Sequence, residues 1–95
     1  MTNAHERTVE FYWRPGCGFC MLLRANLDTT GLPRRDVNIW DDPDAAARVR
    51  AVADGNETVP TVFVGAAALV NPTIDEVLDV VREHAPELLA SRSEL

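Results

Sequence analysis

The chain has 95 residues, which is enough for one domain with a single buried core. An apolar fraction of 46%, a charged fraction of 25% and a formal charge of −6, without a lysine or arginine cluster, argue against nucleic acid or an anionic membrane as a partner. No apolar run resembles a signal peptide or a membrane span, so we expect a cytoplasmic protein.

The first predicted element is a strand over residues 8–13, whose β-branched and aromatic side chains suit a central position in a sheet. A helix is predicted from Phe19 onward because apolar side chains recur at helical spacing there: Cys20, Leu23 and Leu27. We expect this helix to end at Gly31, with Pro33 just beyond it.

Residues 34–40 alternate with period two, and Val37 and Ile39 share one face, as in a half-buried strand. A strand, a helix and a second strand make a βαβ unit with parallel strands and a right-handed crossover. Asp42 and Pro43 then supply an N-cap and a first helical residue for a second helix. The buried stripe of that helix is predicted to contain Ala46, Val49 and Ala53.

Two short strands over residues 61–64 and 67–70 are separated by two residues, so we expect an antiparallel hairpin. The last helix follows and carries the most regular amphipathic pattern in the chain, formed by Ile74, Val77, Leu78 and Val81. Two residues could cap this helix: Asn71, which is followed by a proline, and Thr73, which could form a capping box with Glu76. The sequence leaves both possibilities open.

The predicted order is therefore β-α-β-α-β-β-α, an α/β fold with a four-stranded mixed sheet flanked by helices. We assign residues 1–95 to a single domain, with a core over about residues 8–85. A loose N-terminal tail precedes this core, and a short C-terminal extension follows Pro86.

Both cysteines of the chain, Cys17 and Cys20, fall where the first strand passes into the first helix. In a reducing compartment a close cysteine pair is more often catalytic or metal-binding than a structural disulfide. At the helix N-terminus Cys17 would be acidified by unpaired N–H groups and by the helix dipole, whereas Cys20 lies one turn inward. We therefore expect Cys17 to attack a disulfide and Cys20 to resolve the mixed disulfide that forms.

Arg14 precedes Cys17 by three residues, so its charge either lies near that sulfur or is solvated at the strand end. A closed tetrahedral zinc site would need two further ligands. The chain offers His5 in the N-terminal tail and His84 at a helix end. We expect no metal site.

These features together resemble the glutaredoxin class of thioredoxin-fold proteins. The resemblance is carried by Cys17-Gly18-Phe19-Cys20 after the first strand, by Thr58-Val59-Pro60 before the hairpin, and by the loop that opens the last helix. It implies a thioredoxin-like fold and thiol–disulfide oxidoreductase chemistry. It also implies that Pro60 is cis and faces Cys17, and that Val59 pairs its backbone with the incoming peptide or thiol.

Glutaredoxins proper have a Gly-Gly turn and an acidic residue that helps to hold glutathione, whereas this chain has Asn71-Pro72 and Ile74 there. The run from Asp54 to Val62, together with Asn71-Pro72-Thr73, is similar to the mycoredoxins of actinobacteria, which use mycothiol instead. Asn71 and Thr73 could serve to cap the last helix or to contact the ligand, and the sequence leaves both roles open.

The resemblance implies an enzyme that reduces mixed disulfides of proteins or of low-molecular-weight thiols and binds no cofactor. Mycothiol, or alternatively glutathione, would be the reducing co-substrate, with an NADPH-dependent reductase upstream, and we expect a monomer. The catalytic residues would be Cys17 and Cys20. The residues that bind the substrate or thiol would be Arg14, Phe19, Thr58, Val59, Pro60, Asn71 and Thr73.

Two alternatives stay open. One is a glutaredoxin-like electron donor that is reduced by thioredoxin reductase or by glutathione. The other is a carrier of a 2Fe–2S cluster, because Cys-Gly-Phe-Cys differs by one residue from the Cys-Gly-Phe-Ser of monothiol glutaredoxins, although Cys20 favours disulfide chemistry. Among the aromatic residues, Trp13 and Trp40 are assigned to sheet packing, whereas Phe19 is expected to touch substrate.

Overall fold

The computed structural model describes residues 8–89. Its elements follow one another as β1 (Val9–Trp13), α1 (Gly18–Asp28), β2 (Arg34–Asn38), α2 (Pro43–Val52), β3 (Thr61–Val64), β4 (Ala67–Val70) and α3 (Ile74–His84). This is the predicted order. The expected N-terminal tail and the end of the C-terminal extension lie outside the described residues. No helix within residues 8–89 is long and apolar enough to cross a bilayer.

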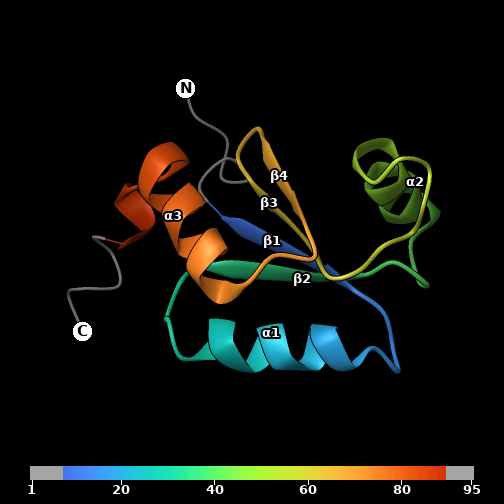
Figure 1. Cartoon of the computed structure of the whole chain (residues 1–95), viewed down its shortest axis with the longest axis horizontal. Helices are drawn as coiled ribbons and strands as arrows, with labels where there is room; N and C mark the ends of the chain where they lie inside the picture. The colour runs from blue at the N-terminus through green and yellow to red at the C-terminus, as the bar shows by residue number, and fades with distance from the viewer. Residues whose placement is uncertain (1–7, 90–95) are drawn as a thin grey trace.

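The four strands form one mixed sheet in the order β2-β1-β3-β4 (Figure 1). β1 pairs with β2 in parallel and with β3 antiparallel, and β3 pairs with β4 antiparallel. The central position predicted for β1 is therefore confirmed. Because β1 and β2 are parallel, their carboxyl ends lie at the same edge of the sheet. One of these ends leads to the cysteines and the other to α2.

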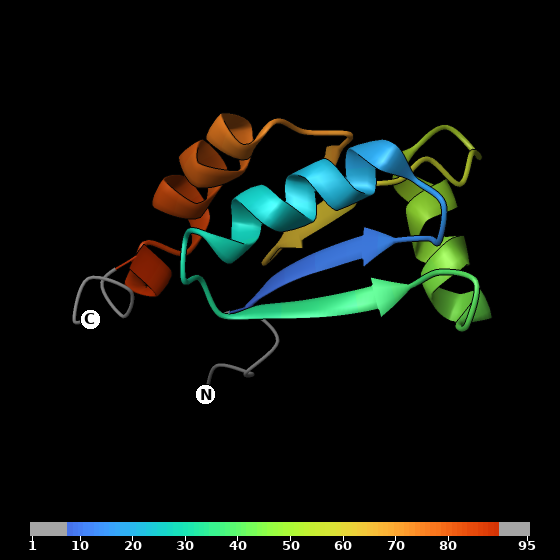
Figure 2. The ribbon, with the colours of Figure 1, turned by 90° about the horizontal axis from the view of Figure 1, so that it is seen from below.

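α1 and α2 cover opposite faces of the sheet. Neighbouring residues of a strand point to opposite faces. The Arg24 guanidinium of α1 lies 4.3 Å from the centre of the Trp13 ring, whereas Arg48 of α2 donates to the Tyr12 hydroxyl at 2.8 Å. Arg48 also meets the carboxylate of buried Glu10 at 2.9 Å, so that charge is paired. α3 packs beside α1 and against the β3–β4 hairpin (Figure 2).

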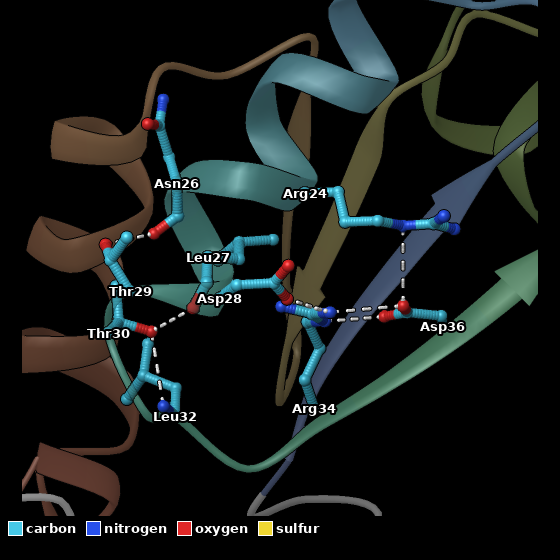
Figure 3. Close-up of polar contacts among 9 residues, drawn as sticks. All are labelled: Arg24, Asn26, Leu27, Asp28, Thr29, Thr30, Leu32, Arg34 and Asp36. Atoms are coloured by element: carbon cyan, nitrogen blue, oxygen red, sulfur yellow. Dashed lines mark hydrogen bonds and ion pairs between the residues drawn. The ribbon is translucent and has the colours of Figure 1, made fainter.

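α1 ends at Asp28, before the predicted stop at Gly31. Figure 3 shows the cause: the hydroxyls of Thr29 and Thr30 each donate to a carbonyl of the last helical turn, both at 2.7 Å. These bonds satisfy carbonyl groups that the end of a helix leaves without intrahelical partners. Gly31, with φ of +70°, then turns the chain toward β2.

The same corner of the molecule holds a cluster of ion pairs (Figure 3). Arg34 of β2 contacts Asp28 of α1 at 2.7 Å and Asp36 at 2.6 Å, and Arg24 lies 3.8 Å from Asp36. Pairs that remain in contact with solvent contribute on the order of 0.5 kcal/mol each. The cluster therefore fixes where α1 lies over β2 more than it stabilises the fold.

β2 ends at Asn38, before the predicted end of the strand at residue 40. The Asn38 side chain accepts the N–H of Trp40 at 2.9 Å, so the chain turns away from the sheet there. The predicted packing of Trp40 in the sheet is wrong, because this residue is 65% exposed, whereas Trp13 is half-buried. Val37 and Ile39 are both buried, as their shared face predicted.

Thr73, and not Asn71, caps α3. The Thr73 hydroxyl accepts the N–H of Glu76 at 3.2 Å, and the Glu76 carboxylate accepts the N–H of Thr73 at 2.8 Å. Asn71 instead adopts a left-handed φ of +50° between β4 and the helix. Of the two possible N-caps in the sequence, the helix therefore uses Thr73, with its capping box. The helix that begins there buries Val77 and Val81 in the core.

Thr73→Ala should lower the free energy of unfolding by about 1 kcal/mol, because it removes the oxygen that accepts the Glu76 N–H. Urea denaturation followed by circular dichroism measures this loss. Thr73→Ser keeps the oxygen and is the matched control. Equal stability of the alanine and serine variants would show that the capping box does not hold the start of α3.

Candidate active site

Cys17 is the N-cap of α1. Its backbone is extended, with φ of −97° and ψ of 107°, and its sulfur accepts the N–H of Cys20 at 3.2 Å. Serine, threonine or aspartate usually supplies the accepting oxygen at this position. Here a sulfur takes that place, at the positive end of the helix dipole. Cys17 is a free cysteine and only 7% exposed.

Cys20 lies one turn into α1 on the buried stripe of the helix and has no exposed surface. Burial raises the pKa of the Cys20 thiol to about 12, and its hydrogen bond with Cys17 acts in the same direction. The backbone and the charge of Arg14 oppose this rise without cancelling it. Cys20 therefore keeps its proton at neutral pH. The charge of Arg14 acts on Cys20 in this structure, and Arg14 itself is half-buried.

The loop before β3 reaches the sulfur of Cys17. The Cys17 thiol donates to the carbonyl oxygen of Val59 at a sulfur–oxygen distance of 3.6 Å. The peptide bond between Val59 and Pro60 is cis, which confirms what the resemblance implied. The N–H of Asn71 donates to the Pro60 carbonyl at 2.8 Å, so the loop that precedes α3 is tied to the same place. Thr58 is half-buried at the start of this loop.

A pocket of about 350 Å³ opens between α1 and the loop that leads into α3. Its lining residues are Phe19, Leu22, Leu23, Asn26, Asn71, Pro72, Thr73 and Ile74. Three predicted binding residues thus share one cavity: Phe19, Asn71 and Thr73. Neither cysteine lines the pocket; Phe19, which lies between them in sequence and is 68% exposed, connects it to the start of α1.

Sequence reasoning did not assign the other five lining residues to binding: Leu22, Leu23, Asn26, Pro72 and Ile74. Two of these, Leu22 and Asn26, lie on α1 outside its buried stripe. With Phe19 they follow the spacing i, i+3 and i+7, which places all three on one face of a helix. This spacing could have found them. The spacing does not show, however, that this face of α1 lies against the start of α3.

No group of three or more histidine, cysteine or acidic side chains within residues 8–89 is arranged to hold a metal ion. Of the two histidines weighed as ligands, His84 is the last residue of α3, and His5 lies outside the described residues. The described part of the site is therefore a pair of thiols, a backbone carbonyl and an adjoining pocket.

This constellation defines a class of protein. A thiol at a helix start, with a second thiol one turn inward, is suited to thiol–disulfide exchange. The sequence pattern of the Glutaredoxin family matches residues 9–67, so the chain belongs to the glutaredoxin family. It is a thiol–disulfide oxidoreductase, as the sequence resemblance predicted.

Known proteins agree with this assignment. A relative in Mycobacterium tuberculosis strains H37Rv and CDC 1551, named "Putative glutaredoxin", is 39% identical over 70 residues, which are 73% of this chain and 83% of that protein. The glutaredoxin-like NrdH-redoxin of Escherichia coli has a TM-score of 0.66 at 22% identity, covering 77% of this chain and 93% of its own. Buckwheat glutaredoxin in complex with glutathione has a TM-score of 0.58 at 20% identity, covering 90% and 78%. These structures confirm the predicted thioredoxin-like fold.

Cys20→Ser should trap a mixed disulfide on Cys17, because no second thiol remains to release the bound partner. Intact-mass spectrometry after exposure to a glutathionylated or mycothiolated peptide measures the adduct. Cys17→Ser should abolish reduction of the same peptide. Wild-type activity of the Cys17→Ser variant would overturn the assignment of roles.

Iodoacetamide at about pH 8 should modify Cys17 in the native reduced protein and leave Cys20 unmodified. With a pKa of about 12, Cys20 is a thiolate in roughly one molecule in ten thousand at that pH, and it is also shielded from the reagent. Peptide mapping measures which cysteine carries the label. Protein unfolded in guanidinium chloride is the control, in which both cysteines should react. Equal labelling in the native protein would contradict the asymmetry between the two thiols.

Proposed function

We propose that this protein is a cytoplasmic, monomeric reductase of mixed disulfides that takes its electrons from mycothiol. Its substrates are mixed disulfides of proteins or of low-molecular-weight thiols. An NADPH-dependent reductase upstream regenerates the mycothiol.

The observation that carries this proposal is the uncharged lining of the pocket beside the cysteines. None of its eight lining residues is ionisable. Glutathione has two carboxylates and an ammonium group, and an ion placed against such a lining loses hydration without gaining a partner. Mycothiol has an N-acetyl group, an amide and the hydroxyls of a sugar and an inositol, none of which is ionised at neutral pH.

The pocket also offers suitable hydrogen-bonding groups. Asn26, Asn71 and Thr73 line it and carry side-chain amides and a hydroxyl, which can serve the amides and hydroxyls of a neutral ligand. Phe19 and Leu22 give the same cavity apolar surface. A site with mostly apolar walls and a few polar groups is typical of small-molecule recognition. The Mycobacterium relative supports the proposal too, because mycoredoxins belong to actinobacteria.

The geometry supports the following reaction. The Cys17 thiolate attacks the mycothiol sulfur of a mixed disulfide, the sulfur–sulfur bond breaks, and the substrate leaves as a thiolate. Cys20 then attacks Cys17, which forms the Cys17–Cys20 disulfide and releases mycothiol, and the Cys20 proton passes to the departing sulfur. Two further mycothiol molecules reduce the protein disulfide and leave as mycothiol disulfide, which the upstream reductase reduces with NADPH.

A coupled assay that follows NADPH consumption tests the electron source. Three reducing systems are offered in parallel: mycothiol with its reductase, glutathione with its reductase, and thioredoxin reductase alone. We expect turnover with mycothiol at a kcat/KM at least tenfold above the other two systems, a difference of about 1.4 kcal/mol in transition-state stabilisation. A kcat/KM with the glutathione system or with thioredoxin reductase that equals or exceeds the value with mycothiol would refute mycothiol dependence. The assignment as an oxidoreductase would remain intact.

Phe19→Ala should raise KM for a mycothiolated peptide by roughly fivefold, because it removes an apolar wall of the pocket. Met21→Ala is the matched control, since Met21 is also exposed on α1 but does not line the pocket. Steady-state kinetics of both variants in the mycothiol system provide the measurement. A similar KM for the two variants would mean that the ligand does not enter this cavity.

A further inference from the structure

Three consecutive carbonyl groups beside Cys17 accept hydrogen bonds from three different parts of the molecule. We call the segment Thr58–Pro60 the three-carbonyl loop. The Val59 carbonyl accepts from the Cys17 thiol at 3.6 Å, and the Pro60 carbonyl accepts from the Asn71 N–H at 2.8 Å. The Thr58 carbonyl accepts from the hydroxyl of Thr61 at 2.8 Å. The loop is therefore held by the nucleophile, by the pocket and by the strand that follows it.

Thr61 is the polar member of an otherwise apolar strand. It is the first residue of β3, it has no exposed surface, and the three residues after it are Val62, Phe63 and Val64. Valine has nearly the same shape as threonine and would need no hydrogen-bond partner in this position. Packing alone therefore does not explain the hydroxyl. What the hydroxyl adds is the bond that closes the three-carbonyl loop onto the strand.

We propose that Thr61 is a positioning residue for disulfide exchange: through Thr58, its hydroxyl fixes the backbone of Val59 against Cys17 and against the backbone of a bound substrate. The Thr61 hydroxyl bonds to the Thr58 carbonyl, so it would act on the reacting sulfurs through the loop. Exchange requires the attacking, central and leaving sulfurs to lie nearly in line, so a small rotation of the loop reduces the fraction of productive encounters. The proposal concerns the exchange step itself and does not depend on which thiol supplies the electrons.

The test compares two disulfides that release the same coloured leaving group. One is a short cysteine peptide joined to nitrothiobenzoate, and the other is the symmetric disulfide of nitrothiobenzoate, which has no peptide backbone. In both reactions the Cys17 thiolate attacks a sulfur, the sulfur–sulfur bond breaks and nitrothiobenzoate leaves as a thiolate. Stopped-flow absorbance of the reduced protein gives the two rate constants. Their ratio isolates the contribution of the substrate backbone.

Thr61→Val should lower the rate constant for the peptide disulfide roughly tenfold and that for the symmetric disulfide less than about twofold. Its melting temperature should stay close to that of the wild type, because the buried shape is kept. Thr61→Ser keeps the hydroxyl and should restore the peptide rate to within about twofold of the wild type, while the lost methyl group lowers the melting temperature by a few degrees, on the order of 4 °C.

A purely structural role predicts the reverse order, with the serine variant more impaired than the valine variant. That result would overturn the proposal, as would an unchanged ratio of the two rate constants in Thr61→Val. An equal loss with both disulfides would also overturn it, because the substrate backbone would then play no part. Should the valine variant fail to fold, Thr61→Ala compared with Thr61→Ser answers the same question.

Discussion

The geometry of the candidate site is organised around one contact, between the sulfur of Cys17 and the carbonyl oxygen of Val59. Forty-two positions separate these residues in the chain, and the pairing of β1 with β3 brings their segments to the same end of the sheet. β1 ends just before the cysteines, β3 begins just after Val59, and Tyr12 of β1 stands opposite Thr61 of β3. Because a shift of one residue in this register would carry the loop away from the nucleophile, the antiparallel pairing of β1 and β3 is as much a part of the site as the thiols.

The two cysteines share one short motif and differ in environment. The sulfur of Cys17 stands at the start of a helix, accepts the N–H of Cys20 and donates to the carbonyl of Val59. Cys20 is withdrawn into the core, where burial holds its pKa at about 12. A resolving thiol that stays protonated does not compete with the nucleophile for substrate. The helical turn between them therefore separates the two steps of exchange.

Much of the fold could be predicted from local sequence, because hydrophobic periodicity dictates which segments are strands and which are helices. The errors arose where a side chain competes with the backbone. The Asn38 amide ends β2, and the Thr29 and Thr30 hydroxyls end α1 before Gly31. For the site, cysteine spacing pointed to Cys17 and Cys20, and family resemblance pointed to Val59. Asn26 was not predicted because the pocket that it lines is completed by the loop before α3, which only the folded chain brings near it. The bond of Thr61 to Thr58 is local, but the position of that loop beside Cys17 depends on the fold.

The capping box of α3 has a consequence for what the pocket can recognise. Helix N-termini attract anions, since their first N–H groups lack partners and carry the positive end of the dipole. Here Thr73 and Ile74 line the pocket, yet the Thr73 N–H already binds the Glu76 carboxylate. The helix thus carries an internal counter-ion, and a ligand carboxylate would have to displace it. At this end of the pocket an acidic ligand would therefore meet an N–H that is already bound and a carboxylate of like charge.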